Sequence, residues 1–161
     1  MSHPFDELVL DGSAALLFTP CPGTKTEALK DSLLTLKQAG ASAILTLMPA
    51  EEMERNQVTD LPLLCQELGL AWFHCPIEDD QAPQADFATA WQQQSPQIHQ
   101  LLKESKKIAI HCKGGSGRTG LVAAQIMIER GIDKERVKQR IQALRPYALT
   151  LAPHLTYFQS L

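Results

Sequence analysis

The sequence lacks the features that mark membrane, secreted and fibrous proteins. No apolar run approaches the roughly 18 residues that a membrane-spanning helix needs. The first ten residues, MSHPFDELVL, carry Asp6 and Glu7 where a secretory leader would be basic. Nine glycines and ten prolines are too few for a disordered or collagen-like chain. We therefore expect a cytoplasmic protein that binds no membrane.

Cysteine is also scarce, and its spacing is irregular. The four cysteines form no CxxC pair. A zinc ribbon and a disulfide framework both require regular cysteine spacing, so neither is expected. Cys65 lies among leucines and is expected in the core.

Length and composition predict one globular domain over residues 1–161. The chain has 44% hydrophobic and 20% charged residues, and a fold of this size needs no metal or disulfide for stability. Its net charge of −3 is uneven, because residues 103–145 carry +7 and the remainder carries −10. The basic segment can attract a compact anion, although for most of these residues a solvated charged face of a helix at 134–140 is the favoured interpretation. Without a basic stripe that includes aromatics, nucleic acid is not an expected partner.

Short apolar runs alternate with helical patterns along the chain. SAILTL (42–47), LAWFHC (70–75) and KIAIHC (107–112) contain no glycine or proline, as expected for buried parallel strands. The earlier segment LVLDGSAALLF predicts a hairpin added at a sheet edge. This alternation predicts an α/β fold with a central, mostly parallel sheet of about four to five strands flanked by helices. We expect strands 70–75 and 107–112 to be neighbours.

Apolar residues at helical spacing predict six helices, near residues 29–36, 61–68, 87–102, 118–130, 137–144 and 151–158. Pro96 is expected to kink or split the third of them. Gly40, Gly69 and Gly131 are expected just beyond helix ends.

Glycines are concentrated in one loop, HCKGGSGRTG. Four of the nine lie at positions 114, 115, 117 and 120, after the strand that ends near His111 and before a helix that begins near Arg118. Such glycines let successive backbone N–H groups turn inward as a nest, and the helix N-terminus adds its dipole. An anion of phosphate size fits this site. The same field favours the thiolate of Cys112, which would make it a nucleophile.

The neighbours of Cys112 have complementary chemistry. Arg118 can donate two N–H groups to phosphate oxygens and follow the charge as it spreads in the transition state. Thr119 can donate its hydroxyl to the sulfur and so make Cys112 a better leaving group in a second step. His111 is expected to fix the loop through a backbone carbonyl. The predicted phosphate-binding loop comprises Lys113, Gly114, Gly115, Ser116, Gly117 and Arg118.

Three other motifs compete for this stretch. A GxGxxG dinucleotide fingerprint needs a second strand ending in an acidic residue about 20 positions later, where this chain has the basic ERVKQRIQALRP. A Walker loop needs glycine and lysine at the positions of Cys112 and Arg118. A GxSxG nucleophile elbow needs glycine at the position of Arg118. A buried, inert cysteine would need neither the glycines nor the arginine.

The stretch HCKGGSGRTG resembles the HCxxGxxR(S/T) signature of the cysteine-dependent protein phosphatases. This signature fixes five residue types over nine positions. The resemblance implies a phosphocysteine intermediate on Cys112 and no metal or cofactor.

A second loop supplies carboxylates. Cleavage of a phosphate ester needs an acid that protonates the leaving oxygen and later activates water. PIEDDQAP (76–83) resembles the acid loop of the kinase-associated phosphatase branch of the dual-specificity phosphatases. That match makes Asp79 the acid, with Asp80 as the alternative and Glu78 facing solvent. A plain acidic surface turn would explain all three equally.

The resemblance extends to FTPCPGTK (18–25), and the spacing of the three blocks fits, so it covers residues 16–158. It implies a dual-specificity-phosphatase-like fold and hydrolysis of phosphotyrosine, phosphoserine or phosphothreonine monoesters in a phosphorylated protein or peptide. The branch acts on a cyclin-dependent kinase, which suggests a protein kinase as a partner, but a shared scaffold does not transfer a substrate.

Three alternative functions stay open. A phosphoprotein-binding module usually lacks the cysteine or the acid, and both are present here. A rhodanese-like sulfurtransferase has a similar cysteine-to-arginine loop, but Thr119 and the acid loop argue against it. For a phosphoinositide phosphatase, Lys113 matches one basic position, but Ser116 stands where a second lysine would bind the inositol ring.

Two residues have open roles. Several relatives carry a glutamine near the C-terminus that positions the hydrolytic water, and this chain offers His154 there, although a surface or core histidine is the alternative. Cys75, at the end of its strand, is a candidate for a disulfide with Cys112 on oxidation.

Overall fold

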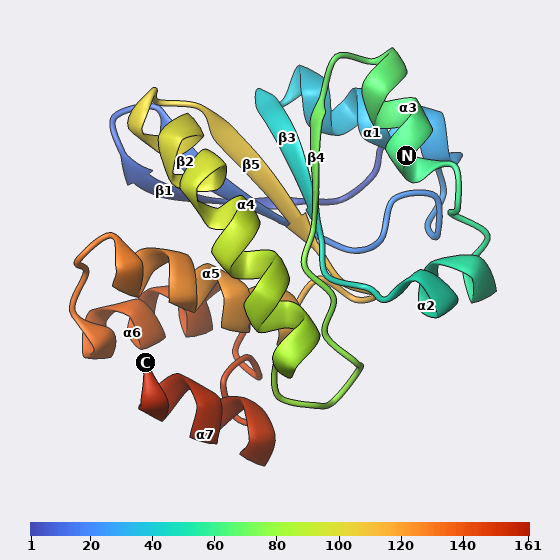
Figure 1. Ribbon diagram of the computed structural model, residues 1–161. Coiled ribbons are helices and arrows are strands. Elements are labelled where there is room, and N and C mark those ends of the chain that lie inside the picture. The colour runs from blue at the N-terminus through green and yellow to red at the C-terminus, as the bar shows by residue number, and fades with distance from the viewer.

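The computed structural model describes residues 1–161 and shows a five-stranded sheet with helices on both faces (Figure 1). The strands are β1 (Asp6–Asp11), β2 (Ala14–Thr19), β3 (Ala41–Thr46), β4 (Ala71–His74) and β5 (Lys107–His111). The helices are α1 (Leu29–Gln38), α2 (Ala50–Arg55), α3 (Leu61–Glu67), α4 (Ala85–Lys103), α5 (Gly117–Glu129), α6 (Lys134–Leu144) and α7 (Ala152–Ser160). None of them combines the length and apolar character needed to cross a bilayer.

The strand order is β1-β2-β5-β3-β4, in which only β1 is antiparallel to its neighbour. The predicted mostly parallel sheet and the hairpin at its edge are therefore confirmed. The prediction that strands 70–75 and 107–112 are neighbours is wrong, because β3 lies between β4 and β5. β5 instead lies between β2 and β3, and the strand order reverses there. In α/β sheets, ligands bind beyond the strand ends at such a reversal. The loop after β5 thus leaves from the middle of the sheet.

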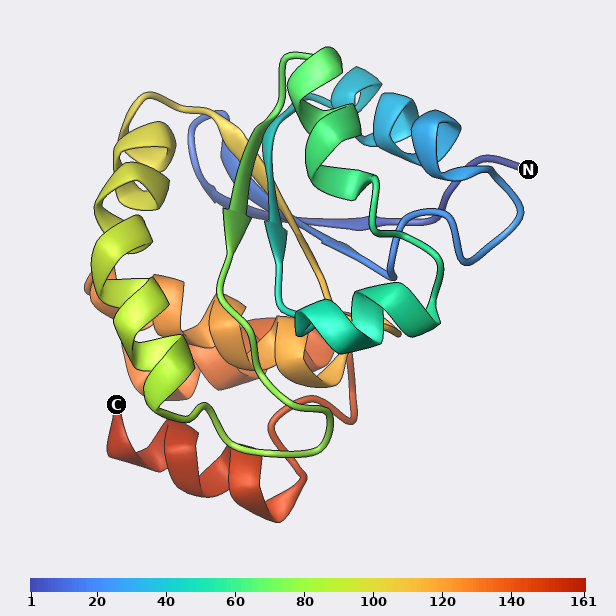
Figure 2. The ribbon, with the colours of Figure 1, turned by 45° about the vertical axis from the view of Figure 1, so that its right-hand side comes forward.

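Successive residues of the strands face two separate cores. Ile108 and Ile110 of β5 belong to the larger apolar cluster, which includes side chains of α4, α5, α6 and α7. Ala109 belongs to the smaller cluster, together with side chains of α1, α2 and α3. Figure 2 shows these two groups of helices on either side of the sheet. Because successive side chains of β5 point to opposite faces of the sheet, both faces of this central strand are buried, as expected for the apolar run KIAIH.

The helices agree with the predicted ones in all but two respects. Gly40, Gly69 and Gly131 follow helix ends with positive φ, as expected. Pro96 was expected to kink or split its helix, and the split is wrong, because α4 continues through Pro96. Pro96 and Gln92 are both exposed, so water can bind the Gln92 carbonyl that has lost its helical N–H partner. The short helix α2 was not predicted.

Candidate active site

The loop between β5 and α5 is held by hydrogen bonds to its carbonyl groups. Cys21 N donates to Lys113 O at 3.0 Å, and Arg145 Nε donates to Gly115 O at 3.0 Å. Gly115 has φ +81°, and a Cβ atom on it would lie 2.6 Å from the carbonyl carbon of Thr19. Only glycine fits this close approach. These carbonyls are bound to neighbouring segments, and the loop amides other than Gly115 N remain for an anion, as in a backbone nest.

Cys112 lies at the start of this loop and is 4% exposed. Thr119 Oγ1 donates to its Sγ atom at 3.2 Å, and Gly115 N donates to the same sulfur at 3.3 Å. Two hydrogen-bond donors are therefore directed at one sulfur. The structure thus brings Thr119 to the cysteine from the first turn of α5.

His111 connects the loop to the neighbouring strands. Its Nδ1 lies 3.0 Å from Cys112 O, and its Nε2 lies 2.8 Å from Thr46 Oγ1, which also accepts a hydrogen bond from Trp72 Nε1 at 2.8 Å. A carbonyl can only accept, so Nδ1 carries the hydrogen and Nε2 accepts from the Thr46 hydroxyl. Burial lowers the pKa of His111 to about 4. The ring is therefore neutral at physiological pH.

Arg118 is 2% exposed, and a carboxylate from α2 holds its guanidinium group. Arg118 Nη1 donates to Glu52 Oε1 and Nη2 donates to Glu52 Oε2, both at 2.8 Å. Nη1 also donates to Ile77 O at 2.9 Å, at the start of the acid loop. A bidentate pair of this kind fixes the plane of the guanidinium as well as its position.

One edge of the Arg118 guanidinium remains free. Its Nε atom is buried and has no hydrogen-bond partner. Both N–H groups of Nη1 and one of Nη2 are used by Glu52 and Ile77, which leaves Nε–H and the outer N–H of Nη2. Buried donors are nearly always paired, so an unpaired one calls for a ligand or a functional reason. This parallel pair of N–H groups matches two oxygens of a phosphate group.

Asp79, in the acid loop, lies beside the Arg118 guanidinium. Its Oδ1 lies 3.4 Å from Arg118 Nη2, and its side chain is 67% exposed. Asp80 makes no ion pair with Arg118 and has φ +61°, while Glu78 is exposed. Asp79 is therefore the carboxylate of this loop that the structure brings to the phosphate-binding loop.

The other predicted loop residues differ in exposure. Lys113 and Gly114 are exposed at its rim, and Ser116 and Gly117 are half-buried where α5 begins. A methyl group on Gly117 would lie 3.4 Å from His154 Cε1, so the ring of His154 packs against this end of the loop. His154 is buried, at 3% exposure.

The remaining cysteines are free thiols in the interior. Cys65 belongs to the smaller core, as predicted. Cys75 is fully buried in the larger core, and burial raises its pKa to about 12. A buried thiol of this kind is a weak nucleophile. The disulfide between Cys75 and Cys112 stays a prediction.

Two functional residues escaped the sequence analysis. Glu52 is 66 positions from Arg118, and Arg145 is 30 positions from Gly115. Neither belongs to a local motif, and α2, which carries Glu52, has no apolar period that would predict it. No signal in a single sequence connects either residue to the loop.

Comparisons relate the chain to known proteins. A family model described as "Polymorphic toxin system, DSP-PTPase phosphatase" matches residues 21–132. The chain is 32% identical to cyclin-dependent kinase inhibitor 3 of Rattus norvegicus and 33% identical to that of Homo sapiens, each over 110 residues, or 68% of this chain and 50% of the relative. It thus spans about half the length of these relatives.

A solved structure is similar over nearly the whole chain. The kinase-associated phosphatase, with its catalytic-site cysteine substituted by serine, has a TM-score of 0.84 at 23% sequence identity. The match covers 99% of this chain and 94% of that chain. At this identity the likeness shows the fold, which agrees with the α/β architecture described above.

Proposed function

The chain belongs to the dual-specificity phosphatase (DSP-PTPase) family, in its kinase-associated phosphatase branch, and from this premise we propose that it hydrolyses phosphate monoesters of proteins through a phosphocysteine on Cys112. One observation carries the proposal. The sulfur that accepts two hydrogen bonds stands in the same loop as Arg118, whose Nε–H and Nη2–H edge is free for two phosphate oxygens.

In the first step, the Cys112 thiolate attacks phosphorus in line with the ester oxygen. The S–P bond forms as the P–O bond breaks, and Asp79 gives its proton to the leaving oxygen. The loop amides and the free edge of Arg118 bind the three equatorial oxygens, on which charge spreads in the transition state. Glu52 keeps that edge aligned throughout.

In the second step, ionised Asp79 takes a proton from water, and the resulting hydroxide attacks phosphorus. The S–P bond breaks, inorganic phosphate leaves and the thiolate is restored. The Thr119 hydroxyl, which donates to the sulfur, stabilises the charge that returns to Cys112. Neutral His111 holds the Cys112 carbonyl and so fixes where the sulfur points.

Hydrolysis of p-nitrophenyl phosphate tests the proposal directly. We expect turnover that EDTA does not reduce and that vanadate, a tetrahedral phosphate mimic, inhibits. Cys112→Ser should abolish it, because the serine hydroxyl is not ionised at neutral pH. Full turnover by this variant would disprove the mechanism. A phosphorylated protein kinase is the first protein substrate to test, as the names of the relatives suggest.

Replacement of the acid gives a sharper test of its assignment. Asp79→Ala should lower kcat by about 10²–10⁴ with little change in vanadate inhibition, because Asp79 protonates the leaving oxygen in the first step and activates water in the second, and takes no part in phosphate binding. Asp80→Ala, one residue along the same loop, is the matched control and should lose far less. The reverse order of the two variants would make Asp80 the acid.

A further inference from the structure

His154 joins the two loops of the proposed site. Its Nε2 lies 3.0 Å from the carbonyl oxygen of Gln81 in the acid loop, two residues after Asp79. The Cε1 atom of the ring, next to Nε2, packs against Gly117, the first residue of α5. Figure 2 shows the segment between β4 and α4 beside the start of α7, where His154 lies. One side chain thus contacts both the acid loop and the end of the phosphate-binding loop.

The tautomer of His154 follows from its partner. The Gln81 carbonyl can only accept a hydrogen bond, so Nε2 is the protonated nitrogen. Burial lowers the pKa of the imidazole, opposed by its hydrogen bond to Gln81 and by the negative charges of Asp80 and Asp79, while Arg118 adds to the lowering. Nε2–H is present in both the neutral and the protonated ring. The bond to the acid loop is therefore kept throughout the working pH range.

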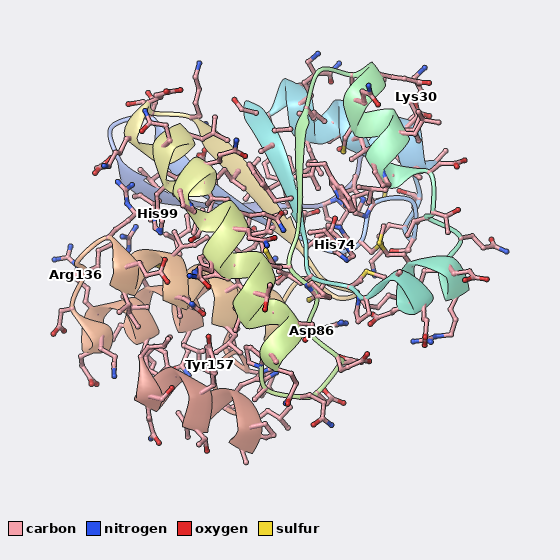
Figure 3. The ribbon with its side chains drawn as sticks, in the orientation of Figure 1. Lys30, His74, Asp86, His99, Arg136 and Tyr157 are labelled. Carbon is pink, nitrogen blue, oxygen red and sulfur yellow. The ribbon has the colours of Figure 1, made fainter.

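The helix that carries His154 is itself fixed to the rest of the molecule. The Tyr157 hydroxyl donates to Gln125 Oε1 on α5 at 2.7 Å, and Figure 3 shows Tyr157 pointing from α7 toward α5. Phe158 is buried in the larger core. Since α5 also begins with the end of the phosphate-binding loop, α7 and that loop share one rigid support.

The acid loop is also fixed at Ile77, which is hydrogen-bonded to Leu47 and Arg118, and by a turn in which Gln81 N donates to Glu78 O at 3.1 Å. Asp79 itself is 67% exposed and lies 3.4 Å from Arg118 Nη2, an atom whose outer N–H a phosphate would also bind. Asp80, with φ +61°, has a backbone conformation that few residues adopt, and Gln81 and Glu78 are exposed. An exposed loop of this kind needs an outside contact to hold one position.

We propose that His154 is a positioning residue, which holds the acid loop at Gln81 so that Asp79 stands at the leaving oxygen. This inference rests on the proposed function and extends it, because it assigns His154 to the proton-transfer step rather than to phosphate binding. This role uses only Nε2 of His154, and whether the ring also positions the hydrolytic water stays a separate prediction.

The test compares two substrates that differ in their need for a proton. p-Nitrophenolate leaves readily without protonation, whereas the phenoxide from phenyl phosphate, with a pKa near that of tyrosine at about 10, needs the acid. His154→Leu fills the space of the ring but cannot donate. We expect it to lower kcat/KM for phenyl phosphate by about tenfold or more, and for p-nitrophenyl phosphate by less than about threefold. kcat/KM is the right quantity because it reports only the steps up to transfer onto Cys112.

Conservative variants separate the hydrogen bond from the packing. His154→Gln places an amide N–H where Nε2 stands, and should recover most of the activity on phenyl phosphate. His154→Asn is one bond shorter, cannot reach Gln81, and should behave like His154→Leu.

In an Asp79→Asn background, His154→Leu should cause little further loss of activity on phenyl phosphate, because both changes remove the same step. Tyr157→Phe loosens α7 without touching Gln81, and is the control for a merely structural effect.

Several results would overturn the inference. These are an equal loss on both substrates, no difference between His154→Gln and His154→Asn, full additivity with Asp79→Asn, or a weaker vanadate inhibition in His154→Leu. The proposed function fails separately, if the unaltered protein hydrolyses neither substrate. If His154→Leu does not fold, the comparison of His154→Gln with His154→Asn decides the matter alone.

Discussion

Among the buried polar side chains around Cys112, only the Nε atom of Arg118 is left without a hydrogen-bond partner. His111, Thr119 and Arg118 are all buried, and each makes a hydrogen bond whose partner is also fixed. The nucleophile, its donors and the arginine could be predicted because they lie within eight consecutive residues. Glu52 could not, because contact between α2 and α5 exists only in the folded chain.

His111 makes folding stability depend on pH. Its folded pKa of about 4 lies below the ordinary value of 6.5, so between these values the unfolded chain binds a proton that the folded chain does not. The free energy of unfolding should therefore fall as pH falls from 6.5 to about 4. The shift amounts to roughly 3 kcal/mol at its full extent.

Denaturant unfolding at several pH values checks this prediction. In His111→Asn, the amide can still donate to the Cys112 carbonyl, but the side chain no longer titrates. The stability difference between the unaltered protein and this variant should shrink between pH 7 and pH 4.5, by about 2 kcal/mol or more. A difference that stays constant over this range would mean that His111 is not the titrating group.

Among the elements, α2 has the weakest sequence signal and a central place in the site. It has six residues, AEEMER, of which only Glu52 and Met53 are buried. Met53 packs in the smaller core, and this contact sets the rotation of the helix that directs Glu52 toward Arg118. Short helices are stabilised by tertiary packing rather than by their own propensity, which is why the pattern did not predict this one. By contrast, β5 is a continuous apolar run and α5 has 13 residues with apolar spacing, so both could be predicted.

Glu52→Gln tests the contribution of this helix to the site. The amide has the shape of the carboxylate, but its NH₂ group meets an N–H of Arg118 and its charge is gone. Loss of one partner of a buried ion pair costs about 3–5 kcal/mol of folding stability. The misaligned guanidinium should also lower kcat/KM by about 10²-fold.

Glu51→Gln is the matched control, because Glu51 is the exposed neighbour in the same helical turn. Its effect on the unfolding free energy should stay within about 0.5 kcal/mol. Thermal unfolding and p-nitrophenyl phosphate kinetics measure both variants. Equal effects of the two substitutions would show that the charge of Glu52, and not its contact with Arg118, is what matters.

At the scale of the whole molecule, the uneven charge of the sequence holds the edge strand in place. β1 carries acidic side chains, and the basic segment 103–145 pairs with three of them: Asp6 with Arg145 at 2.7 Å, Glu7 with Lys107 at 2.6 Å and Asp11 with Arg130 at 3.0 Å. The sequence allowed two interpretations of the basic segment, a solvated face and an anion site. The structure gives Lys107, Arg130 and Arg145 a third role, which is to pair with acidic residues of β1. The sequence could not show it, because pairing of β1 with distant basic residues depends on strand order.

Neutralisation of β1 tests this role. In Asp6→Asn/Asp11→Asn, two exposed ion pairs are lost, each worth up to about 1 kcal/mol. The unfolding free energy should fall by about 1 kcal/mol in low salt, and the gap to the unaltered protein should close near 1 M NaCl, where the Debye length is about 3 Å. Urea unfolding at both salt concentrations measures it.

The control must change the net charge equally, since a protein of net charge −3 also responds to charge as a whole. Glu54→Gln/Glu67→Gln removes two exposed acidic groups that form no ion pair. If net charge were the cause, both double variants would change the unfolding free energy by similar amounts, and added salt would shift both changes in the same direction. If the ion pairs hold β1, only Asp6→Asn/Asp11→Asn loses stability. Vanadate inhibition of this variant should also be weaker, because Arg145, which pairs with Asp6, also binds the Gly115 carbonyl. The acidic edge strand and the phosphate-binding loop would then be parts of one electrostatic arrangement, joined through Arg145.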